Sequence, residues 1–274
     1  MLSIEEIKLL IEKLEKIKGE DFQQLLDSNL KILKDLELAV DANNQEAIGR
    51  LDKPESWFAR DLEQKRVTPI VDPWLYRVIQ TKIFQFARSA MADASTDKGL
   101  YNSLEIGPGV GMFSKEFRQW RLNYFLDILP AVENKIRRRF PPLHQKYLKF
   151  FRTRETECSN IPQGSCNFIF SWDTFVFFTQ RHVQQYLHDF NRVLVPGGYC
   201  FIQYADCHFD HDLHEAKRGY WNYNTKTAMT KMIEEEGYEV VDMNQFRPGA
   251  NYAVFKKPGK QNPVVYKIHE ITLD

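Results

Sequence analysis

The sequence predicts an α/β fold in which an all-helical N-terminal extension precedes a doubly wound, seven-stranded, mostly parallel sheet with an antiparallel last strand. In about the first third of the chain, apolar residues recur at three- and four-residue steps, which is the stripe of an amphipathic helix. From Tyr101 onward, short apolar runs alternate with helical patterns, which is typical of a parallel sheet covered by helices. A glycine-rich turn marks the start of this alternation.

Residues 1–93 are predicted to form a helical cap or interaction segment. One apolar stripe spans residues 4–17, and Ser3 with Glu6 has the spacing of a capping box at its start. A second stripe spans residues 22–36, which predicts an antiparallel pair of helices. Such a pair can cap a site, cover the core or mediate a homodimer, and these alternatives stay open.

The second half of this extension leads into the sheet. Residues 43–73 contain Pro54, Pro69 and Pro73, which predicts short helices and loops that cross the surface. Residues 74–91 are predicted to form one longer helix. Its expected buried residues are Trp74, Ile79, Ile83, Phe84, Phe86 and Ala87.

Residues 94–258 are predicted to form the α/β domain. Its strands are expected at 104–106, 122–126, 147–151, 167–171, 199–204, 239–245 and 251–256. Its helices are expected at 112–120, 131–140, 181–193 and 225–236. A proline–glycine turn at 247–250 joins the last two strands into an antiparallel hairpin. Residues 259–274 are expected to form a C-terminal tail.

Composition narrows the class of function. The 274 residues carry 37 basic and 37 acidic side chains, so no charge excess predicts binding to nucleic acid or to an anionic membrane. No apolar run has the length of a membrane span or a signal peptide. The four cysteines lack any paired spacing, which argues against a disulfide framework or a structural zinc site. We therefore expect a cytoplasmic protein.

The glycine turn predicts a nucleotide-like ligand. Gly107, Gly109 and Gly111 follow the first strand, and Asp127 ends the next apolar run. Glycine allows a sharp turn and the close approach of a ligand, both of which a side chain would block. A dinucleotide-binding turn would place its third glycine at position 112, where the chain has Met112. A nicotinamide-dependent oxidoreductase is therefore disfavoured, as it is by the final hairpin.

The run from Glu105 to Gly111 resembles the first motif of class I S-adenosylmethionine-dependent methyltransferases. The resemblance extends over residues 101–257, and a terminal antiparallel hairpin is also a feature of that family. It implies S-adenosyl-L-methionine as the cofactor. The sequence departs from the family pattern at two positions. Pro108 stiffens the turn, and Glu157 stands where the family more often has aspartate.

The resemblance also implies which residues contact the cofactor. Asp127, followed by Ile128, stands where the family has the carboxylate that accepts both ribose hydroxyls, and two acceptor oxygens suit a vicinal diol. Glu157 or the backbone of Cys158 is implied at the adenine edge, and Ser171 with Trp172 is implied beneath the cofactor. The full implied set is Glu105, Gly107, Gly109, Gly111, Asp127, Ile128, Glu157, Cys158, Ser171 and Trp172.

The catalytic residues are less constrained. Methyl transfer from a sulfonium needs mainly proximity and alignment, but a hydroxyl acceptor also needs a base for its proton. Candidate bases are Asp173, directly after the fourth strand, and His208, the histidine nearest the end of the fifth. His208 shares the segment 206–215 with His211 and His214. Three interpretations of this segment stay open: a solvated loop, a loop that contacts the substrate, or a metal site. Its spacing is not diagnostic of a metal site, and we predict no metal.

These observations predict a methyltransferase that acts on a small molecule, at an oxygen of a sugar or another hydroxylated metabolite. Trp221 and Tyr223, interleaved with Asn222 and Asn224, are the expected wall for such an acceptor. The alternative is a noncatalytic S-adenosylmethionine-binding or scaffold protein that works through its helical N-terminus.

Overall fold

The computed structural model describes residues 72–92, 101–129, 132–153 and 157–259. The predicted helices within residues 4–36, the segment 43–71 and the tail 260–274 lie outside the described residues, as does any dimer contact they make. Within the described part of the chain, no helix combines the length and the apolar character needed to cross a membrane.

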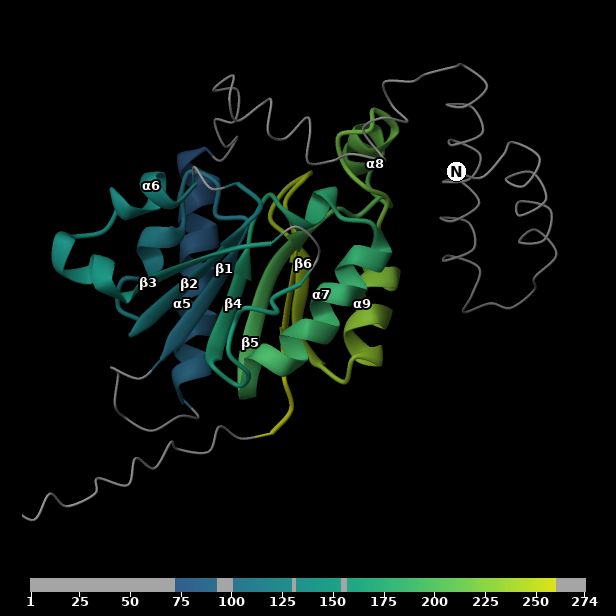
Figure 1. Ribbon diagram of the computed structural model, residues 1–274. Helices are drawn as coiled ribbons and strands as arrows, with labels where there is room; N and C mark the ends of the chain where they lie inside the picture. The colour runs from purple at the N-terminus through teal and green to yellow at the C-terminus, as the bar shows by residue number, and fades with distance from the viewer. Residues whose placement is uncertain (1–71, 93–100, 130–131, 154–156, 260–274) are drawn as a thin grey trace, which may run out of the picture.

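The structure confirms the predicted sheet. Its seven strands are β1 (Asn102–Ile106), β2 (Leu122–Asp127), β3 (Leu148–Arg152), β4 (Cys166–Ser171), β5 (Leu194–Tyr204), β6 (Glu239–Gln245) and β7 (Asn251–Lys256). They lie in the order β3-β2-β1-β4-β5-β7-β6, with β1 to β5 parallel and β7 antiparallel to both neighbours (Figure 1). The strand order reverses between β1 and β4, which is the position where doubly wound sheets bind their ligands.

The helices agree with the sequence less closely than the strands. The α-helices are α5 (Pro73–Ala92), α6 (Val132–Arg137), α7 (Gln180–Val193), α8 (Asp210–Lys217) and α9 (Lys226–Glu235). The short 3-10 helices are η1 (Ser114–Phe117), η2 (Pro142–Tyr147) and η3 (Phe175–Phe177). Of these, α8 was not predicted, since its segment carries no apolar stripe.

Two predicted helices are shorter than expected. The helix expected at 112–120 is only η1, since its backbone bonds close three-residue turns, such as that from the Trp120 N–H to the Phe117 carbonyl at 3.0 Å. The helix expected at 131–140 ends at Arg137, because Pro141 and Pro142 follow and disfavour helical backbone before them.

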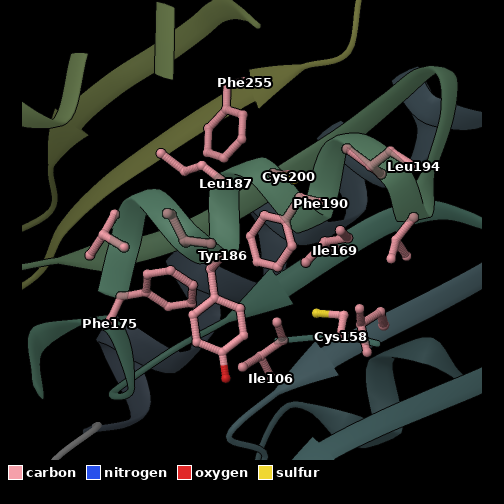
Figure 2. Packing of buried hydrophobic residues seen from close by; sticks show 14 of the residues in the cluster. Ile106, Cys158, Ile169, Phe175, Tyr186, Leu187, Phe190, Leu194, Cys200 and Phe255 are labelled. Carbon is pink, nitrogen blue, oxygen red and sulfur yellow. The ribbon is translucent and has the colours of Figure 1, made fainter. Parts of the chain in front are cut away.

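One face of the sheet packs against α7 and α9, which lie in front of the strands in Figure 1. The apolar stripe of α7 includes Tyr186, Leu187 and Phe190, which meet Ile169 of β4 and Cys200 of β5 in one buried cluster (Figure 2). The hydroxyl of Thr179 caps the start of this helix by accepting the His182 N–H at 3.3 Å.

The opposite face of the sheet packs against α5 (Figure 1). The buried residues of α5 are Leu75, Ile79, Ile83, Phe86, Ala87 and Ala90. They meet aromatic side chains of β4 and β5, so both faces of these central strands are covered. The expectation that Trp74 and Phe84 are buried is wrong, since they are 55% and 40% exposed. Both lie off the three- and four-residue stripe that faces the sheet.

Candidate active site

The glycine turn between β1 and η1 is built for close approach. Gly107 has a φ of +62°, and a Cβ there would lie 2.1 Å from Oγ1 of Thr174, in the loop after β4. The Thr174 hydroxyl lies 3.3 Å from the Gly107 carbonyl and donates to it. Gly109 has a φ of +54°, and a Cβ there would meet no atom within 4 Å. Gly107 therefore admits the β4 loop, whereas Gly109 borders open space.

Asp127 ends β2 beside this turn, with only 9% of its surface exposed. Its Oδ1 accepts the Leu129 N–H at 2.9 Å, whereas its buried Oδ2 has no partner among the described residues. Burial raises the pKa of Asp127 to about 6, although N–H groups of Leu129, Gly109 and Ile128 oppose this shift. A buried acceptor without a partner is costly, and a ribose diol would supply one.

Glu105 lies beneath the turn, almost fully buried. The Ser114 hydroxyl donates to its Oε2 at 2.6 Å. Burial raises the pKa of Glu105 to about 8, and the charge of Asp127 adds to this rise while that of Arg139 opposes it. Ser114 carried no signal in the sequence, since it stands inside the segment predicted as an ordinary helix.

The end of β4 faces the same turn. Ser171 is fully buried, and its hydroxyl donates to the Ile106 carbonyl at 2.8 Å, which ties β4 to β1. The ring of Trp172 packs edge-on against Phe113 and Phe201, each at 6.2 Å between centroids. The structure therefore brings Ser171 and Trp172 to the glycine turn, but the Ser171 hydroxyl already bonds the protein.

Glu157 and Cys158 lie on the α7 side. Glu157 is exposed and borders an open pocket along α7, together with Arg181 and His188. The Cys158 N–H donates to the carboxylate of Asp189, and its carbonyl accepts from Arg192 at 2.7 Å. Arg192 and Asp189 also pair at 2.7 Å, so the loop is anchored to α7. The backbone N–H expected at adenine is thus already bonded to a side chain.

The comparisons with known proteins agree with this geometry. A family model described as a methyltransferase domain matches residues 54–243. The chain belongs to the class I S-adenosylmethionine-dependent methyltransferases. The cofactor of this methyltransferase is S-adenosylmethionine, and the unpartnered Oδ2 of Asp127 beside the open space at Gly109 fits it.

Solved methyltransferases share the fold at low sequence identity. The N-methyltransferase NodS from Bradyrhizobium japonicum, in complex with S-adenosyl-L-homocysteine, is 16% identical with a TM-score of 0.54, over 73% of this chain and 98% of NodS. The CurJ carbon methyltransferase is 16% identical with a TM-score of 0.54, over 82% of this chain and 70% of that chain. Geranyl diphosphate C-methyltransferase from Streptomyces coelicolor is 9% identical with a TM-score of 0.51, over 66% of this chain and 79% of that chain. Curated protein sequences contained no match to this chain.

Asp173, the first candidate base from the sequence, directly follows Trp172 at the end of β4. Among the described residues it is the one non-glycine residue with a positive φ, at 55°. Its N–H donates to Oε1 of Gln203 at 2.6 Å, and Nε2 of Gln203 donates to the Gly249 carbonyl at 2.9 Å. Burial raises the pKa of Asp173 to about 6. The sequence carried one signal for Gln203, an amide within the apolar strand β5.

His208, the other candidate base from the sequence, lies at a different place in the fold. His208 precedes α8, its Nδ1 lies 3.0 Å from Oδ1 of the buried Asp206, and it borders an open pocket along α9. No contact within the described residues joins His208 to the glycine turn. In the described ranges, no group of three or more His, Cys, Asp or Glu side chains is placed to hold a metal ion.

The expected polar wall is only partly present. The Asn222 backbone N–H and Nδ2 donate to the carbonyls of Val176 and Phe177, at 2.7 and 2.6 Å. Oδ1 of Asn224 accepts the Thr225 N–H at 2.9 Å. Both amides therefore bond backbone groups of the protein itself. This anchoring places the neighbouring Trp221 beside the loop that follows Asp173.

Proposed function

We propose that this methyltransferase transfers the methyl group of S-adenosylmethionine to an oxygen of a small, hydroxylated acceptor. The observation that carries the proposal is the half-buried carboxyl of Asp173, a hydrogen-bond acceptor suited to a hydroxyl group, which directly precedes the Thr174 side chain that contacts the glycine turn. The cofactor, when bound, supplies an activated methyl group and a good leaving group.

The side chains at the crevice have separate roles in this proposal. Asp127 accepts the ribose hydroxyls through its unpartnered Oδ2, and the open space at Gly109 admits the cofactor. Glu105 holds the turn through Ser114. Asp173 accepts a hydrogen bond from another donor group of the acceptor and orients the molecule. The balance of 37 basic and 37 acidic residues supports a small acceptor over a polyanion.

Calorimetric titration with S-adenosyl-L-homocysteine tests the cofactor half of the proposal. Turnover then tests the acceptor half, with S-adenosylmethionine and a panel of sugars, phenols, amines and carbon acids, and with mass spectrometry of the products. We expect methylated hydroxyl compounds to accumulate. Products methylated only at nitrogen or carbon would contradict the oxygen assignment, and cofactor binding without turnover of any acceptor would favour the noncatalytic alternative.

A further inference from the structure

A carboxylate–imidazole pair at the start of α8 was not singled out by the sequence. Asp212 is fully buried, and its Oδ1 lies 3.1 Å from Nδ1 of His211. Its Oδ2 accepts the Asp206 N–H at 2.8 Å and a hydrogen bond from Nδ2 of Asn251. The carboxylate is thus fixed by the end of β5 and the start of β7. A carboxylate that binds Nδ1–H leaves Nε2 as the nitrogen able to accept a proton.

The surroundings of His211 link it to Asp173. A Cβ at Gly249 would lie 2.6 Å from Cε1 of His211, so this glycine gives the imidazole its room. The indole of Trp221 lies 5.6 Å from the imidazole between centroids, at an angle of 58°. Nε2 of Gln203 donates to the Gly249 carbonyl, and Oε1 of the same side chain accepts the Asp173 N–H. Contacts therefore run unbroken from Asp173 to His211.

His208 offers a natural comparison, because it also pairs through Nδ1 with a buried aspartate. Its pocket, however, is lined by α9, including Lys226, Thr230 and Glu234. Two histidines therefore have the same kind of partner, but only His211 contacts the tryptophan and the glycine that adjoin the Asp173 loop. Spacing in the sequence favoured His208, whereas position in the fold favours His211.

We propose that His211, oriented by Asp212, is the general base for the acceptor hydroxyl and that Trp221 forms the wall against which this acceptor lies. This inference rests on the proposed function and names its base. The acceptor oxygen forms a bond to the methyl carbon with its own electron pair. The carbon–sulfur bond breaks with its electrons left on sulfur, and the acceptor proton moves to Nε2 of His211 and then to water.

His211→Gln and His211→Ala test the assignment, with His214→Gln on the same helix as the matched control. The readout is turnover of the best acceptor from the panel. We expect the His211 variants to lose about 10²- to 10⁴-fold in kcat, with affinity for S-adenosyl-L-homocysteine unchanged within about twofold. Added imidazole should restore part of the turnover of His211→Ala and none of that of His214→Gln, which should start near the wild-type rate.

Other outcomes overturn the inference in distinguishable ways. If His208→Gln loses turnover and the His211 variants keep it, the base is His208. If His211 variants lose cofactor affinity as much as kcat, the histidine supports the cofactor site. If the wild-type protein binds the cofactor but turns over no acceptor, the proposed function itself fails, and the base assignment with it.

A structural readout is independent of turnover. Nuclear magnetic resonance of isotope-labelled histidine rings, assigned with His211→Gln, reports which ring nitrogen carries the proton. We expect the neutral ring of His211 to be protonated at Nδ1, since that nitrogen faces Asp212. Protonation at Nε2 would remove the proton-accepting nitrogen from the acceptor side and overturn the inference.

Discussion

Burial gives two neighbouring carboxyl groups different tasks. Glu105 is enclosed beneath the glycine turn with a hydroxyl donor, and its pKa of about 8 means that it carries a proton at neutral pH for much of the time. Asp127, with a pKa of about 6, is mostly charged at neutral pH and keeps one oxygen without a partner. The first carboxyl therefore supports the turn, and the second is suited to a ligand.

Asp127→Ala should weaken binding of S-adenosyl-L-homocysteine by about 10- to 150-fold, since hydrogen bonds to a charged group contribute about 1.5–3 kcal/mol. In the wild-type protein, affinity should fall as the pH is lowered through about 6, because protonation removes the acceptor charge of Asp127. Calorimetry across this range measures both effects. Asp127→Asn is the control, and a pH-dependent affinity in that variant would assign the titration to another group.

Glu105→Gln should change how stability depends on pH. In the wild-type protein, the pKa of Glu105 is raised from 4.5 to about 8, so the folded state binds its proton more tightly than the unfolded state. Its contribution to the free energy of unfolding is complete below pH 4.5 and is lost as the pH rises through about 8. In urea unfolding, the free energy of unfolding of the variant should decline less than that of the wild type as the pH rises from 4.5 to about 8. Equal declines would show that Glu105 does not titrate there.

At the level of elements, the turn after β1 depends on two glycines for different reasons. Gly107 faces the β4 loop, where a methyl group would collide with Thr174, whereas Gly109 faces open space. Both have positive φ, so alanine at either position adds backbone strain of about 1–2 kcal/mol. Only at Gly107 does a collision add to the strain.

Gly107→Ala should therefore lower the melting temperature more than Gly109→Ala. Gly109→Ala should fold, with a small loss of stability, but bind S-adenosyl-L-homocysteine much more weakly, because its methyl group projects into the cofactor space. Thermal melts and calorimetry on the two variants separate stability from binding. Unchanged affinity in Gly109→Ala would show that this space does not receive the cofactor.

The strands could be read from the sequence because each is a short apolar run with turn residues at its ends, as in Leu122–Asp127 and Cys166–Ser171. Helical patterns were less reliable where buried aromatic side chains lie along tight turns, as at Phe113 and Phe117. The helix α8 was not predicted because its buried residues, such as Asp212 and Ala216, do not form an apolar stripe.

At the scale of the whole molecule, the sheet is covered on one face by α7 and α9 and on the other by α5 (Figure 1). The helix α5 lies in the segment predicted as an N-terminal cap or interaction segment, and its buried stripe packs directly on β4 and β5. The family match also begins at residue 54, ahead of this helix. We infer that α5 folds together with the sheet.

Ile83→Ala and Phe84→Ala test this inference at adjacent positions of α5. Ile83 is 1% exposed and Phe84 is 40% exposed. We expect Ile83→Ala to lower the free energy of unfolding by about 2–5 kcal/mol through loss of buried contacts and the cavity left behind. Phe84→Ala should change it by only about 0.5 kcal/mol. Urea unfolding followed by circular dichroism measures both, and equal effects would show that α5 is not part of the core.

The sequence by itself determined the fold class, the family and the identity of the cofactor. Glu105, the glycines and Asp127 lie within one segment that runs from β1 through η1 to β2, and the pairing of these two neighbouring strands brings them together. Only the tertiary structure brought together the residues of the proposed acceptor side. Asp173, Gln203, His211 and Gly249 come from separate loops and strands, and spacing along the chain favoured His208 over His211. Their contacts exist because β4, β5 and β7 lie side by side in the sheet, and sequence periodicity does not report which loops meet.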